Sequence, residues 1–283
     1  MYMAELHPDT VIFGNGWYTS RQKINNIPEP CCITIDTYYT FSDHLPTIFI
    51  QVEPQIINPS EKYLIENYHK YHTIYTFNQN VLDKCPNAKK YVYGTSWVSP
   101  NNIDISKKQF KISSLSSTKR IGESRGHVLR QVLYHHQHLF QDIPFTWYRS
   151  SVHIPHLIDY GNNPFISSTL LGKTELFDEF QFALVIENSK ETNYFTEKIM
   201  DCLLRKTIPL YWGCPNIAEY FDTTGWIILE TESVEELLEK CRTLTSDYYS
   251  TYTNNIEKNY ETAKKYIHFT DNLNNAVSTR NHV

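Results

Sequence analysis

The sequence predicts an α/β protein with two domains and mostly parallel sheets. Short apolar runs alternate along the chain with helix-like segments, the pattern of parallel strands connected by helices. The 283 residues suffice for two domains of ordinary size. A hydrophobic content of 41% and a charged content of 20% are typical of a folded protein rather than a disordered one.

The first predicted domain covers residues 1–105. Its strands are short runs rich in Ile, Val, Tyr and Thr, which favour extended structure, and they lie at Val11–Phe13, Cys32–Ile35, Thr47–Val52, Thr73–Phe77 and Tyr91–Tyr93. Helices are expected between them, at Ser60–Tyr71 and Asn78–Lys84. The polar, turn-rich stretch Ser96–Lys108 then indicates a linker between the domains.

The second predicted domain covers residues 106–283, and its last helix is a candidate to pack back on the first domain. Its strands are expected at Phe110–Leu115, Phe145–Tyr148, Phe182–Ile186, Thr207–Trp212 and Trp226–Leu229. Its helices are expected at His127–Phe140, Glu175–Phe180, a segment opened by Thr196, Ser233–Thr243 and Ser246–Ile267. Ser233 and Glu236 have the spacing of a capping box, which supports the helix that follows them.

Charge and cysteine usage exclude several classes of protein. The net charge is −5 and no long Lys/Arg run occurs, so a nucleic-acid partner is not expected. No apolar run reaches the ~18 residues of a membrane span, and the N-terminus lacks the charged start and apolar core of a signal peptide. The six cysteines form no C-x-x-C pair, and we interpret them as reduced thiols of a cytoplasmic protein.

The most informative stretch runs from residue 182 to residue 221. The apolar run Phe182–Ile186 ends in polar residues, and a second apolar run ends at Gly213; the polar positions that follow the first run are Glu187, Asn188, Tyr194, Thr196, Glu197 and Lys198. In a parallel α/β sheet, ligands bind where strands end and helices begin, and a helix start suits a phosphate group. A lone Thr-Glu-Lys would more often be a capped, solvated helix start, but the whole ordered series favours a binding site.

Each residue type in this series has a chemical task. Thr196 is a suitable N-cap because its hydroxyl can accept a backbone N–H. Glu197 can accept hydrogen bonds from ribose hydroxyls, and Lys198 is a point charge suited to a diphosphate. Tyr194 can stack or donate its hydroxyl, and Asn188 can contact the ribose or diphosphate of a nucleotide.

The order Glu-Asn, Tyr-x-Thr-Glu-Lys, Gly and Pro-Asn-Ile resembles the signature of the α-1,3-fucosyltransferase family, glycosyltransferase family 10. The resemblance is strongest over residues 180–221. It implies a GT-B-like fold, with two Rossmann-like domains facing each other across a cleft and the donor held by the C-terminal one. It further implies an inverting transferase that uses a nucleotide sugar, GDP-fucose first.

A second cationic element precedes this signature. The loop over residues 116–126 carries Lys119, Arg120 and Arg125, and Arg130 follows inside the predicted helix. The series Gly126-His127-x-x-Arg130 looks like the family element that supplies an arginine to the donor diphosphate. A guanidinium group offers a fork of donors that fits phosphate oxygens; the alternative is an ordinary arginine on a helix surface.

An inverting transfer needs a base to accept the proton of the attacking hydroxyl. Glu53 is our first candidate because it follows the apolar run Thr47–Val52, as a catalytic Glu does in the family, and Asp36 and His44 are runners-up. No Asp-x-Asp pair occurs, so we expect no metal and no other cofactor; Lys198, Arg130 and helix dipoles would stabilise the leaving diphosphate.

The sequence therefore predicts a metal-independent, inverting glycosyltransferase that moves a sugar to a hydroxyl of a glycan acceptor. Another donor such as UDP-xylose remains open, as do a sugar-nucleotide epimerase and a non-catalytic carbohydrate-binding module. Acceptor, linkage and oligomeric state are not predicted.

Overall fold

The computed structural model describes residues 5–14, 22–101, 103–121, 123–150, 163–166 and 173–278. The chain divides into two compact units. The first unit contains residues 1–94, 191–194 and 268–283, and the second contains residues 95–190 and 195–267. The C-terminal segment therefore belongs to the first unit, and the predicted linker belongs to the second.

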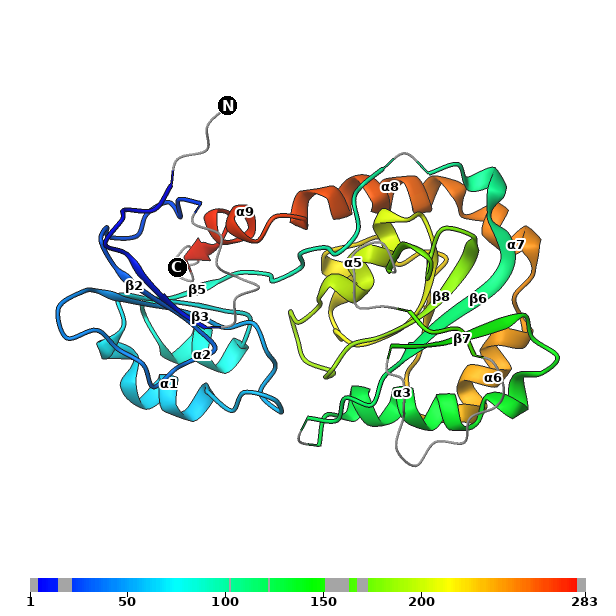
Figure 1. Cartoon of the computed structure of the whole chain (residues 1–283), viewed down its shortest axis with the longest axis horizontal. Helices are drawn as coiled ribbons and strands as arrows, with labels where there is room; N and C mark the ends of the chain where they lie inside the picture. The colour runs from blue at the N-terminus through cyan, green and yellow to red at the C-terminus, as the bar shows by residue number, and fades with distance from the viewer. Residues whose placement is uncertain are drawn as a thin grey trace. The chain divides into compact units, whose positions relative to one another are not determined.

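The first unit is built on a sheet in the order β1-β2-β3-β4-β5-β11 over its described residues (Figure 1). Neighbouring strands are parallel except for the last pair. The strands are β1 (Val11–Phe13), β2 (Cys32–Ile35), β3 (Thr47–Ile50), β4 (Thr73–Thr76), β5 (Ala88–Lys90) and β11 (Val277–Ser278). The helices are α1 (Glu61–Asn67), α2 (Gln79–Lys84) and α9 (Phe269–Asn274).

Successive side chains of a strand point to opposite faces, and β3 shows what each face meets. Phe49 packs in a cluster with Leu64 of α1 and Val81 of α2. Ile48 and Ile50 pack in another cluster that includes Leu273 of α9. This central strand of the unit is therefore buried on both sides, as expected for a parallel strand.

The second unit is built on a parallel sheet in the order β10-β9-β8-β6-β7 over its described residues. The strands are β6 (Gln109–Ser116), β7 (Phe145–Arg149), β8 (Phe180–Ile186), β9 (Ile208–Trp212) and β10 (Ile227–Ile228). The helices are α3 (Arg125–His135), α5 (Glu197–Leu204), α6 (Val234–Arg242), α7 (Ser246–Thr251) and α8 (Thr253–Ala263).

Helices cover both faces of this second sheet (Figure 1). Phe182, Leu184 and Ile186 of β8 lie in one core cluster with apolar residues of α3 and α6. Helix α5 packs against β8, β9 and α8. All seven residues of β8 are buried, which explains its unbroken apolar run between two helical layers.

The strand order places a topological switch beside β6. The chain leaves β6 through α3 to reach β7 on one side, and it then returns to β8 on the other side of β6. Open α/β sheets bind ligands outside the carboxyl ends of the strands at such a switch. The loop before α3 and the start of α5 follow the ends of β6 and β8, respectively.

Most predicted elements are found, and three differ. The expected strand Tyr91–Tyr93 does not form. The segment that pairs with β4 is Ala88–Lys90, directly after the Pro86–Asn87 turn. The expected helix Glu175–Phe180 is mostly turn because Phe180 already begins β8, and the buried Lys108 ammonium group donates to the carbonyls of Phe177 and Phe180.

The third difference is the final helix, which breaks at Tyr252. The N–H of Tyr252 bonds to the carbonyl of Tyr249 three residues earlier, and this tighter turn ends α7 before α8 begins. Gly225 lies against the Tyr252 ring, where a Cβ would come within 2.4 Å of the ring.

Within the described ranges, no helix combines the length and apolar character that a bilayer crossing needs.

Candidate functional site

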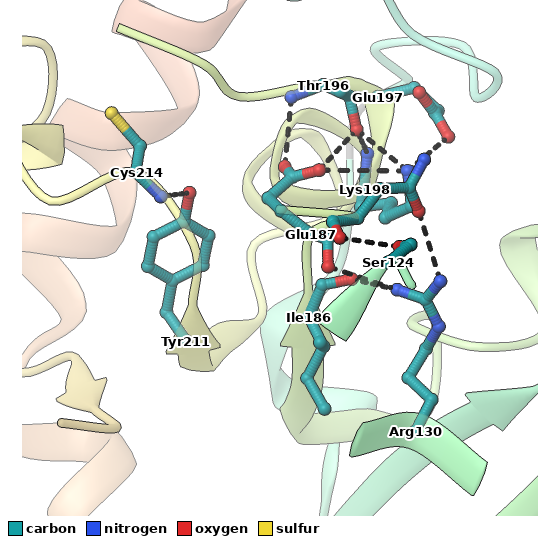
Figure 2. A network of polar contacts seen from close by, with 10 residues as sticks. Ser124, Arg130, Ile186, Glu187, Thr196, Glu197, Lys198, Tyr211 and Cys214 are labelled. Carbon is teal, nitrogen blue, oxygen red and sulfur yellow. Dashed lines mark hydrogen bonds and ion pairs between the residues drawn. The ribbon is translucent and has the colours of Figure 1, made fainter. Parts of the chain in front are cut away.

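Glu187 is the buried centre of the site in the second unit. It directly follows β8, and its N–H extends the pairing with β9 by bonding to the carbonyl of Trp212. Its carboxylate accepts from the N–H of Thr196 at 2.9 Å and from the Thr196 hydroxyl at 2.7 Å (Figure 2). A buried carboxylate requires such partners, so the strand end and the start of α5 are held together.

Thr196 caps α5 as the sequence predicts. Its backbone is extended (φ −130°, ψ −171°), and its hydroxyl accepts from the N–H of Lys198 at 3.4 Å. Glu197 lies in the first turn, where a carboxylate is favourable. The helix then buries Ile199, Met200, Leu203 and Leu204, which fixes the direction of its first turn.

Lys198 is held between two carboxylates. Its Nζ lies 3.2 Å from a Glu197 oxygen and 3.7 Å from a Glu187 oxygen, and it donates to the Thr196 hydroxyl at 3.0 Å. Burial opposes the charged form of Lys198, but Glu197 and Glu187 outweigh it, so its pKa is raised and the ammonium group stays charged at neutral pH. The side chain keeps 27% exposure and is accessible to a ligand.

Arg130 reaches the same strand end from α3. Its guanidinium group donates to the carbonyls of Ile186 and Glu187 (Figure 2). It also donates, at 3.1 Å, to the side-chain oxygen of Asn188. The carbonyl of Asn188 in turn accepts from the Ser124 hydroxyl at 2.7 Å and from the N–H of Gly126 at 3.2 Å. The start of α3 is thereby tied to the end of β8.

Gly126 permits this close approach. A Cβ built on Gly126 would lie 1.7 Å from the carbonyl oxygen of Glu187, which no side chain can accept. Gly213, which follows the end of β9, is similarly crowded: a Cβ built on it would lie 2.6 Å from Cγ of Glu187. Glycines therefore flank Glu187 where backbone and side chain approach most closely.

Replacing Gly126 with alanine should lower the free energy of unfolding by about 1–3 kcal/mol through overpacking. A glycine-to-alanine change in an unstrained helix instead stabilises by roughly 0.4–1 kcal/mol, so the sign of the effect is diagnostic. Urea unfolding of the variant measures it, and Val132→Ala at a half-exposed position of α3 is the control. A more stable Gly126→Ala protein would contradict the packing of α3 on β8.

Lys173 is a further cation that the sequence did not single out. Its ammonium group lies 5.7 Å from the centre of the Trp97 ring. Its pKa is lowered mainly by burial, with attraction from Glu197 and Asp201 and repulsion from Lys198 and Arg130 acting alongside. It therefore lies near the start of α5, and the only signal in the sequence is its position in the loop before β8.

The candidate bases lie in the first unit. The Asp36 carboxylate accepts from the N–H of Val52 at 2.8 Å and from the N–H of Glu53 at 3.1 Å, with Asp36 itself in a left-handed conformation (φ 55°). Burial raises the pKa of Asp36 to about 7, although these N–H groups lower it. β3 ends at Ile50, earlier than predicted, so half-buried Glu53 lies three residues beyond the strand end, and His44 is exposed on a loop.

Tyr194 also belongs to the first unit. It is 1% exposed, and its ring centre lies 5.1 Å from that of Phe77. Of the predicted site residues, the structure thus brings Arg130, Asn188, Thr196, Glu197 and Lys198 together in the second unit, while Tyr194, Glu53, Asp36 and His44 lie in the first. Among the described residues, no three His, Cys, Asp or Glu side chains gather as a metal ion would need.

Comparisons with known proteins agree with this picture. Residues 160–276 match the family model for the C-terminal part of glycosyltransferase family 10 (fucosyltransferase). A stretch of 55 residues is 38% identical to the α-(1,3)-fucosyltransferase FucT of Helicobacter pylori. That match covers 19% of this chain and only 12% of the relative.

Solved structures that resemble the fold at low identity include the following two. The Anabaena protein HepE in complex with UDP-glucose has a TM-score of 0.58 at 12% identity, over 86% of this chain and 76% of that one. TarM has a TM-score of 0.54 at 14% identity, over 86% of this chain and 55% of that one. The predicted fold class, α/β and GT-B-like, is confirmed. The resemblance found in the sequence is confirmed as well: residues 160–276 match the C-terminal part of glycosyltransferase family 10 (fucosyltransferase).

Proposed function

We propose that this protein is an inverting glycosyltransferase that moves a sugar from a nucleoside diphosphate to a hydroxyl of a glycan without a metal ion. The observation that carries the proposal is the convergence of Arg130 and Lys198 at the end of β8, through Asn188 and Glu187. Two cationic groups from different helices are thereby fixed at the switch point of a parallel sheet. This is the place and the chemistry that a diphosphate requires.

In this proposal the site acts on the leaving group. As the bond to the sugar breaks, negative charge grows on the diphosphate, and preorganised cations and helix starts stabilise it. Glu197, in the first turn of α5, accepts hydrogen bonds from ribose hydroxyls, and Thr196 and Asn188 orient the site. Glu53 accepts the proton of the acceptor hydroxyl, with Asp36 and His44 as alternatives.

The donor we expect is GDP-fucose. The family model is that of the fucosyltransferases, and the H. pylori relative is an α-(1,3)-fucosyltransferase. The described side chains of the site contact phosphate and ribose in this proposal and do not select the base, so a UDP sugar such as UDP-xylose is the alternative donor.

A thermal-shift panel of GDP, UDP, CDP and their sugars tests the proposal. A ligand that binds only the folded protein stabilises it by about 2.7 kcal/mol at 100 times its Kd, so GDP and GDP-fucose should raise Tm by several degrees, equally with and without EDTA. No shift with any nucleotide would reject the donor site, and a shift that requires divalent ions would reject metal independence. Conversion of the donor without an acceptor would favour an epimerase.

A further inference from the structure

His127 is a buried polar residue that the proposed function leaves unused. It lies in the first turn of α3, is 3% exposed, and its Nδ1 atom is buried without a hydrogen-bond partner in the described part of the chain. Leaving a buried polar atom without a partner costs about 1–3 kcal/mol. In native proteins such an atom is usually satisfied by a water, an ion or a ligand, or serves in catalysis.

The surroundings of His127 indicate the charge of that ligand. Burial, together with Arg130, Lys198 and Lys119, lowers the pKa of His127 to about 3, so the ring is neutral at pH 7. Arg130 lies one turn further along the same helix. A neutral imidazole among three cations adds no repulsion to the free protein and still offers one N–H to an anion.

The backbone at His127 is also held in place before a ligand binds. Its neighbour Gly126 and the preceding Ser124 both bond to the carbonyl of Asn188, which anchors this turn at the end of β8. The positive end of the α3 dipole adds to the attraction for an anion. A side chain on such an anchored turn loses less conformational freedom when a ligand arrives than one on a mobile loop.

We propose that Nδ1 of His127 donates a hydrogen bond to a phosphate oxygen of the bound nucleoside diphosphate, beside Arg130 and Lys198. The proposal rests on the proposed function, because it assumes that the diphosphate lies at these two cations. It adds a neutral third donor to the site.

Titration calorimetry with inorganic pyrophosphate and GDP tests this contact. His127→Phe keeps a ring but removes the donor, and it should weaken both ligands about tenfold to a hundredfold. His127→Asn places an amide near the position of Nδ1 and should retain most of the affinity. His135→Phe is the matched control, since His135 also has a buried, unpartnered Nδ1 but lies at the other end of α3; its variant should bind as the unmodified protein does.

The outcomes separate this proposal from the proposed function. If His127→Phe binds pyrophosphate normally while Arg130→Met and Lys198→Met lose it, the His127 contact is wrong and the donor site stands. If none of the three variants changes binding, the donor site itself is wrong.

A spectrum of the unmodified protein covers the case in which His127→Phe does not fold. With ¹⁵N-labelled histidine, the chemical shift of Nδ1 of His127 should be that of a protonated nitrogen. This chemical shift should change when pyrophosphate is added. An Nδ1 resonance that does not respond to saturating pyrophosphate overturns the contact.

Discussion

Replacing Lys198 with methionine is expected to slow sugar transfer by about a hundredfold to a thousandfold, the usual effect of removing one group that stabilises charge in a transition state. Affinity for GDP should fall by about tenfold or more, since one charge-assisted contact is lost. Methionine preserves much of the stem and removes the ammonium group, whose raised pKa keeps it charged at neutral pH in the native protein. Initial rates with GDP-fucose and calorimetric titration with GDP measure the two effects.

Two controls separate charge from folding. Breaking a buried ion pair can cost about 3–5 kcal/mol, and Lys198 pairs with the fully buried Glu187, so the Tm of Lys198→Met must be measured alongside. Lys190→Met is the matched control because Lys190 is exposed and lies in the loop that leads from β8 to α5, the helix that carries Lys198. Native-like GDP affinity in a folded Lys198→Met protein would contradict the assignment of Lys198.

Arg130→Met gives an independent measurement on the second cation. Arg130 donates to the carbonyl of Ile186 and to the side-chain oxygen of Asn188, and the Glu187 carboxylate keeps its bonds from Thr196 when Arg130 is replaced. The exposed Arg125 on the same helix, paired with Glu232, supplies the control variant. Loss of GDP affinity in Arg130→Met but not in Arg125→Met is expected.

Glu53→Gln should lower turnover by about a hundredfold to ten-thousandfold, the typical contribution of a positioned general base. Binding of GDP should be unchanged because only proton removal from the acceptor is lost. Transfer of labelled sugar to a glycan array measures turnover on many candidate acceptors at once. A rate equal to that of the unmodified protein would reject Glu53 as the base.

The runners-up are tested in parallel. His44→Gln, on an exposed loop, should leave turnover unchanged. Asp36→Asn should lower both Tm and turnover, because the carboxylate holds the N–H groups of Val52 and Glu53. A large loss of rate in Asp36→Asn without any loss of stability would transfer the role of base to Asp36, whose pKa of about 7 suits it.

The sequence predicts the fold where periodicity is strong. The buried strand β8 and the cap of α5 at Thr196 are found as expected because a long apolar run and an N-cap residue are local signals. The sequence does not predict the break of the last helix at Tyr252, whose ring lies against Gly225, far away in the sequence. One of the two bonds of the predicted capping box is found, since the Ser233 hydroxyl accepts from the N–H of Glu236. The Glu236 carboxylate instead accepts from the N–H groups of Glu230 and Thr231.

In the site, too, residues with local signals are predicted and features set by three-dimensional packing are not. Arg130 and Lys198 are candidates from their residue types, and the structure adds that both converge on the end of β8. The tasks of Ser124 and Gly126 could not be predicted because they depend on the approach of α3 to the carbonyls of Glu187 and Asn188. The unpartnered state of His127 likewise depends on three-dimensional packing, which no local pattern records.

A crystal structure of this protein with bound GDP tests the central claim most directly. We expect phosphate oxygens within hydrogen-bonding distance of Nζ of Lys198 and of the guanidinium group of Arg130, at the start of α5 and α3. GDP bound elsewhere, with both cations still holding only their present protein partners, would contradict the claim.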